Sequence, residues 1–184
     1  MPAFVPGLIL SRGFYYDCVR PIMERHFPAL RYSAALLGTG SDVVGFDTAR
    51  SMDHHWGPRL YLYVAAEDAH QRQPILDALA DNLPVEYRGF PTNFTRPEDD
   101  PEGHGIRNMQ PIKRGPVNHM VTVAELGRAL TRWLGFDPRG DVDLRHWLST
   151  PSQKLLEVTA GDIFHDTLGD LTAVRAVNPV DGQG

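Results

Sequence analysis

Two stretches of sequence decide how this chain is interpreted: Leu36-Leu37-Gly38-Thr39-Gly40-Ser41 and, after eleven intervening residues, Asp53-His54-His55-Trp56-Gly57-Pro58-Arg59. The first stretch has the form of a buried strand that runs into a glycine turn. Glycines have no Cβ, so backbone N–H groups in such a turn can approach phosphate oxygens, and a serine hydroxyl can donate to the same oxygens. An arginine can pair with a phosphate through two parallel hydrogen bonds. The predicted substrate-binding residues are therefore Gly38, Thr39, Gly40, Ser41 and Arg59.

The second stretch carries the predicted metal ligands. Residues two apart in an extended chain point to the same side, so Asp53 and His55 are expected to face one metal position. A neutral imidazole brings no negative charge and prefers ions such as Zn²⁺ or Ni²⁺ over Mg²⁺. If His55 is a ligand, Mg²⁺-dependent transfer is expected to be impaired.

Three neighbouring residues carry structural predictions. Ser41 and Asp42 are expected to cap a short helix that ends near residue 44. Asp47 is expected to bond its own backbone in a turn. Trp56 is interpreted as a packing residue.

Periodicity outside these stretches predicts alternating helices and strands. Helices are expected at residues 11–27 (with a kink or break at Pro21), 67–83, 123–134, 141–148 and 150–156, and strands at residues 32–37, 59–64, 85–90 and 119–123. Residues 91–116 hold five prolines and an acidic run, which predicts a long loop. This order indicates the α/β (α+β) class.

Composition limits the classes of function. The formal net charge of -5 argues against an extended duplex nucleic-acid surface, although a small nucleotide pocket needs only local cations. A single cysteine excludes an intramolecular disulfide and a multi-cysteine zinc site. The N-terminus lacks the pattern of a signal peptide, and no apolar run approaches the ~20 residues that span a bilayer. A cytoplasmic location without a membrane partner is expected.

The chain resembles the DNA polymerase beta-like nucleotidyltransferase superfamily, whose signature is a Gly-Ser turn followed on the next strand by two carboxylates spaced one residue apart. The resemblance is closer to an uncharacterised bacterial family, a domain of unknown function within that superfamily. It rests on residues 6–12, 38–41, 45–48, 53–59, 88–92, 153–157 and 161–166. His55 occupies the position of the second carboxylate.

The resemblance implies a nucleotidyltransferase-like small mixed sheet flanked by helices over residues 1–134, including the 91–116 loop. Residues 135–177 are then the start of a helical C-terminal portion, which is shorter than in the family, and residues 178–184 are a disordered tail. A third carboxylate is expected from a later strand. Asp53 and Glu86 are the predicted catalytic residues, with Glu125 as the weaker alternative to Glu86.

The implied activity is transfer of a nucleoside monophosphate from an NTP to a hydroxyl of an acceptor, with Mg²⁺ or Mn²⁺, or a softer metal because of His55. Small molecules, proteins and RNA are all open as acceptors. The alternative is a non-catalytic nucleotide- or partner-binding module with a degenerate metal site. A third hypothesis is a hydrolase whose transition metal is held by His54, His55 and His119.

Overall fold

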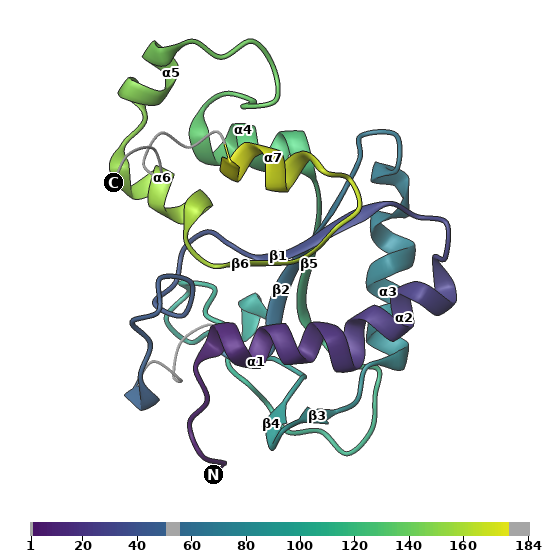
Figure 1. Ribbon diagram of the computed structural model, residues 1–184. Coiled ribbons are helices and arrows are strands. Elements are labelled where there is room, and N and C mark those ends of the chain that lie inside the picture. Colours follow the sequence, from purple (N-terminus) through teal and green to yellow (C-terminus); the bar gives the residue numbers. More distant parts are fainter. Residues whose placement is uncertain (1, 51–55, 177–184) are drawn as a thin grey trace.

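The computed structural model describes residues 2–50 and 56–176, and a four-stranded mixed sheet with helices on both faces forms its centre (Figure 1). The strands are β1 (Tyr32–Leu36), β2 (Arg59–Val64), β5 (Met120–Glu125) and β6 (Asp162–Asp166), in the order β5-β2-β1-β6. β1 runs antiparallel to both of its neighbours, whereas β2 and β5 are parallel. This arrangement confirms the predicted mixed sheet and the α+β class.

The strands predicted on either side of the glycine turn are confirmed. All five residues of β1 are buried, because helices cover both faces of this central strand. In β2 the side chains alternate between two cores, with Leu60 and Leu62 in one and Tyr63 in the other.

One face of the sheet is covered by the N-terminal helices and α3. The helix predicted at residues 11–27 is confirmed but begins earlier, as α1 (Gly7–Phe14), a π-helical turn (Tyr15–Val19) and α2 (Arg20–His26). The π-helical turn ends two residues before Pro21, which has no N–H to bond the carbonyl four residues earlier. α3 (Arg72–Asn82) follows a short 3₁₀ turn (Ala69–Gln71).

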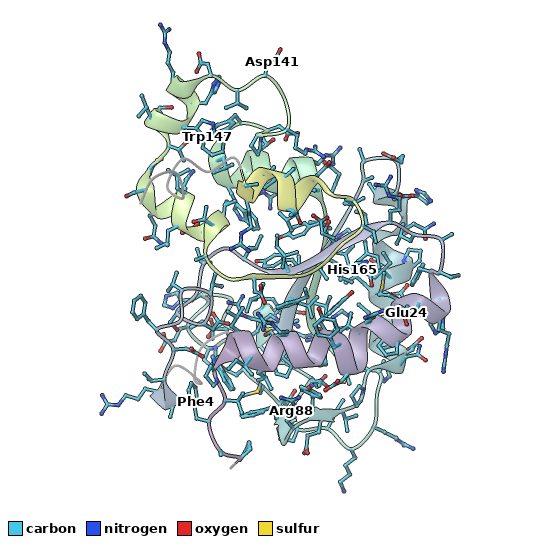
Figure 2. All side chains as sticks on the ribbon, viewed as in Figure 1. Phe4, Glu24, Arg88, Asp141, Trp147 and His165 are labelled. Atoms are coloured by element: carbon cyan, nitrogen blue, oxygen red, sulfur yellow. The ribbon has the colours of Figure 1, made fainter. Side chains whose placement is uncertain are left out.

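The opposite face is covered by the C-terminal helices. α4 (Leu126–Leu134), α6 (Ser152–Thr159) and α7 (Asp170–Ala176) pack on Ala35, Leu37 and Tyr63. Trp147 of α5 (Leu144–Ser149), labelled in Figure 2, makes an edge-to-face contact with Phe136, two residues beyond the end of α4, and their ring centroids lie 5.3 Å apart. The expected short helical C-terminal portion is therefore present, but it also contains β6, which the sequence analysis did not predict.

The single strand predicted at residues 85–90 is wrong. These residues belong to a separate hairpin of β3 (Glu86–Tyr87) and β4 (Phe90–Pro91), not to the main sheet. Arg88 and Gly89 both have positive φ (51° and 84°), which reverses the chain between the two strands. Arg88 lies at this turn, on the side of α1 away from the sheet (Figure 2).

The long segment that follows the hairpin is a loop, as expected. It contains a 3₁₀ turn (Pro97–Asp99) and a bridge between Phe94 and Met109. Within residues 2–50 and 56–176, no helix combines the length and apolar character needed to cross a membrane. The tail predicted at residues 178–184 lies outside the described residues.

Candidate functional site at the carboxyl end of β1

The glycine turn and the start of β2 lie at the same end of the sheet. Because β1 and β2 are antiparallel, with Ala35 opposite Tyr61, the residues that leave β1 are beside those that enter β2. β5 also begins here, with Met120 opposite Arg59. Asp53, His54 and His55 lie outside the described residues, so their side chains are not placed.

The turn at residues 38–41 presents three amides without a partner among residues 2–50 and 56–176. The Gly38 N–H already donates to the carbonyl of Glu157 on α6 (2.7 Å). In the part of the chain that the structure describes, no hydrogen bond is made by the N–H groups of Thr39, Gly40 and Ser41, and all three residues are exposed. The turn therefore offers three successive backbone donors, together with the Ser41 hydroxyl, to an anionic ligand.

Arg59 lies in the predicted site, where it pairs with Asp42. Its Nε and Nη2 donate to the two oxygens of Asp42 at 2.9 and 2.7 Å, and Nη2 also donates to the Thr39 carbonyl at 3.2 Å. The two side chains are 11% and 4% exposed. Arg59 thus ties the turn to β2, and the Nε–Nη2 edge that could form a bidentate phosphate contact is already in use.

Asp42 is a site residue that sequence reasoning missed. The short helix expected after Ser41 is not formed: residues 41–45 make hydrogen-bonded turns, in which the Gly40 carbonyl accepts from the N–H groups of Val43 and Val44. Gly40 has φ +139°, and a Cβ there would collide with Asp42 and Arg59. The glycine is therefore required by the ion pair as well as by the turn.

Asp47 and Trp56 connect the site to the N-terminus. One carboxylate oxygen of Asp47 accepts from the Gly7 N–H (2.7 Å) and from Nε1 of Trp56 (3.0 Å), in place of the expected bonds to its own backbone. Trp56 is buried, stacked on Phe4 and edge-on to Phe90. The packing role predicted for Trp56 is confirmed.

The two candidates for the third carboxylate lie away from the turn. Glu86 is exposed on the β3–β4 hairpin, which Figure 1 draws beyond α1. Glu125 is opposite Val64, at the far end of β5, and it caps α4 by accepting from the N–H groups of Gly127 (2.7 Å) and Arg128 (3.0 Å). A strand rises about 3.3 Å per residue, so the two ends of a six-residue strand are about 17 Å apart.

No residues in 2–50 and 56–176 form a ready metal site, because no three His, Cys, Asp or Glu side chains gather there. His119, one of the three histidines in the hydrolase hypothesis, is buried among protein partners. Its Nε2 is 3.1 Å from the Leu76 carbonyl, and its Nδ1 is 3.2 Å from the Val121 N–H. These bonds define a neutral ring that donates from Nε2 and accepts at Nδ1, so His119 has no free lone pair for a metal.

We expect the free energy of unfolding to decrease as the pH falls below about 6.5. Burial lowers the pKa of His119 below its usual 6.5, and partial burial followed by the charge of Arg20 does the same for His165 on β6, which is labelled in Figure 2. In the unfolded chain these histidines take up protons near pH 6.5, whereas in the native state they do so only at lower pH. Protonation therefore favours unfolding as the pH falls from 6.5 toward the lower native pKa. Urea unfolding from pH 7.5 to 5 measures the slope. His119→Gln should reduce the dependence of the free energy of unfolding on pH, and the substitution of the exposed His104 by Gln should not. An unchanged dependence in His119→Gln would contradict a lowered pKa for His119.

A family model matches the C-terminal part of the chain. The family described as "Domain of unknown function (DUF4037)" matches residues 147–178, which include α6, β6 and α7. This segment contains residues 153–157 and 161–166, two of the phrases on which the resemblance rests. No curated protein and no solved structure matches the chain. The match is limited to this C-terminal segment, and the wider resemblance to nucleotidyltransferases stays a prediction.

Proposed function

We propose that the chain is a nucleotidyltransferase-like protein that binds the phosphates of an NTP at residues 38–41 and transfers a nucleoside monophosphate to a hydroxyl of an acceptor. The observation that carries this proposal is the row of unpaired N–H groups at Thr39, Gly40 and Ser41, exposed beside the start of β2. Triphosphate oxygens are the acceptors that such a row of amides favours. The Ser41 hydroxyl adds a fourth donor.

In the proposed reaction, the acceptor oxygen attacks the α-phosphorus of the NTP. A new P–O bond forms, the bond to the β-phosphate oxygen breaks, and pyrophosphate leaves. Asp53 accepts the hydroxyl proton; the exposed position of Glu86 on the hairpin makes Glu86 the weaker candidate for this role. Asp53 and His55 would hold the divalent ion, whose contribution is to neutralise charge on the phosphates.

The second candidate is a non-catalytic nucleotide-binding module. Two observations favour it: Arg59 is already paired with Asp42, and residue 55 is a histidine where a carboxylate is expected. Such a module would bind nucleotide through the turn at residues 38–41 without needing a metal or Asp53.

The effect of Asp53→Ala on nucleotide binding separates the two candidates. Isothermal calorimetry would measure binding of ATP, CTP, GTP and UTP to the full chain in Mg²⁺, Mn²⁺ or EDTA. The nucleotidyltransferase-like site predicts metal-dependent binding that weakens at least about tenfold in Asp53→Ala, because the variant loses a charged ligand. Asp81→Ala, which changes an exposed aspartate on α3, is the matched control and should bind as the wild type does.

Two results would count against the nucleotidyltransferase-like site. Binding that ignores both the metal and Asp53 supports the module. The absence of binding to all four nucleotides rejects both candidates.

A further inference from the structure

A pocket of about 520 Å³ lies between α4, β5 and the start of α3, and one of its lining residues, Trp133, also lies beside Gly38 of the glycine turn. Its floor includes Tyr61 of β2 and Thr122 of β5, and α4 contributes one wall. Val64 and Glu125, which are paired at the far end of β2 and β5, also line it, so the pocket extends to the sheet end opposite Arg59. This volume is in the range of pockets that hold small molecules.

Three arginines line the pocket, against one carboxylate. Arg128 and Arg132 are four residues apart on α4 and therefore share a face of the helix, and Arg72 begins α3. The carboxylate is Glu125, whose two oxygens already accept the N–H groups that begin α4. The pocket therefore has an excess of positive charge.

The guanidinium groups are available to a ligand. Arg128 is 88% exposed and 3.5 Å from Glu125, while Nε of Arg72 donates to the Val123 carbonyl. Arg132 is exposed and makes no ion pair or side-chain hydrogen bond within residues 2–50 and 56–176. Like charges held together at one pocket repel, and an anion bound between them relieves that repulsion.

Aromatic rings form the other part of the pocket. Tyr61 and Trp133 meet edge to face, with ring centroids 5.9 Å apart and an interplanar angle of 87°. Both side chains are partly exposed and line the pocket. Flat rings stack on such side chains, while guanidinium groups recognise phosphate oxygens.

We propose that this pocket binds a small molecule that combines a flat ring with a phosphate group, the chemistry of a nucleoside monophosphate. Arg128 and Arg132 hold the phosphate, Arg72 adds charge at the rim, and Trp133 contacts the ring. The inference goes beyond the proposed function and does not depend on Asp53, on a metal ion or on residues 38–41.

The test uses the full chain in EDTA at low salt, with AMP as the probe and with adenosine and pyrophosphate as its uncharged and ringless counterparts. Calorimetry measures affinity, and a change in tryptophan fluorescence that is lost in Trp133→Phe, which keeps Trp56 and Trp147, reports on Trp133. We expect AMP to bind more tightly than either counterpart. Arg128→Gln and Arg132→Gln should each weaken AMP binding about tenfold, the loss of one charge-assisted contact.

Matched variants separate the pocket from other sites. Arg145→Gln removes an exposed arginine on α5, outside the pocket, and should bind AMP as the wild type does. Thr122→Tyr fills the floor at an exposed strand position without removing a charge, and it should block binding. Circular dichroism and the melting temperature verify that each variant is folded.

Three outcomes would overturn the proposal. The first is AMP binding that is unaffected by Arg128→Gln, Arg132→Gln and Thr122→Tyr in folded protein. The second is adenosine or pyrophosphate binding as tightly as AMP. The third is no AMP binding at millimolar concentration.

Discussion

Replacing Arg59 with methionine is expected to lower the free energy of unfolding by about 3–5 kcal/mol. The change leaves the Asp42 carboxylate, 4% exposed, without the two charge-assisted hydrogen bonds that it accepts from Arg59. An unpaired charge in so buried a position raises the free energy of the native state and therefore destabilises the fold. Urea unfolding of the wild type and the variant measures the difference.

Two further variants define the cause of this loss. The double variant Arg59→Met with Asp42→Leu removes both charges and should recover much of the lost stability. Arg20→Met breaks the exposed pair with Glu24 on α2 and should leave the free energy of unfolding nearly unchanged, since water and salt screen such pairs. A loss in Arg59→Met no larger than that in Arg20→Met would show that the Arg59–Asp42 pair does not stabilise the fold.

Gly161→Ala is expected to lower the free energy of unfolding by about 3–5 kcal/mol. The loss is the sum of the strain of a positive φ and the displacement of packed atoms. Gly161 has φ +76°, and a Cβ there would overlap the backbone carbonyl of Leu36 and press on Val43 at 3.1 Å. Leu36 is opposite Asp162, the first residue of β6, so the substitution also separates β6 from β1. Thermal and urea unfolding report the loss.

Gly169→Ala is the matched control for Gly161→Ala. Gly169 has a similar φ of +85°, but no atom lies within 4 Å of the position that a Cβ would take. Gly169→Ala should lower the free energy of unfolding only by the strain of the positive φ, about 1–2 kcal/mol. Equal losses in the two variants would mean that the contact with Leu36 contributes nothing.

The parts of the fold that local pattern determines could be predicted from the sequence. β2 begins and ends at the predicted residues 59 and 64, because a run of branched and aromatic side chains suits a strand that contacts two cores. Pro21 marked the interruption in the N-terminal helix, although the sequence did not show that it would take the form of a π-helical turn.

One strand was assigned wrongly and another was not predicted, because tertiary contacts decide both. Gly89 was a visible turn signal, but positive φ at Arg88 is unusual for a residue with a side chain, so residues 85–90 resembled one continuous strand. β6 has charged ends and only five residues, Asp162-Ile163-Phe164-His165-Asp166. It has the same length as β1 but lacks the continuous run of apolar or small residues that identified β1, and pairing with β1 stabilises it.

For the candidate site, the sequence indicated where the turn would lie but not which side chains would meet there. A buried strand that ends in glycines predicts a turn at the end of a sheet, and residues 38–41 lie there. The Asp42–Arg59 pair joins residues 17 positions apart, and it depends on the antiparallel pairing of β1 with β2. Sequence alone therefore could not show that Asp42 already uses the guanidinium expected for phosphate.

The position of β6 has a consequence for how the chain is made. Both neighbours of β1 follow it in the sequence: β2 comes soon after, whereas β6 is the last strand that the structure describes. Until residues 162–166 have left the ribosome, one edge of the fully buried β1 has no partner for its backbone N–H and C=O groups. An apolar strand with an open edge is a template for pairing with another chain, so synthesis passes through an aggregation-prone interval. The pairing of β6 with β1 closes the open edge and ends this interval.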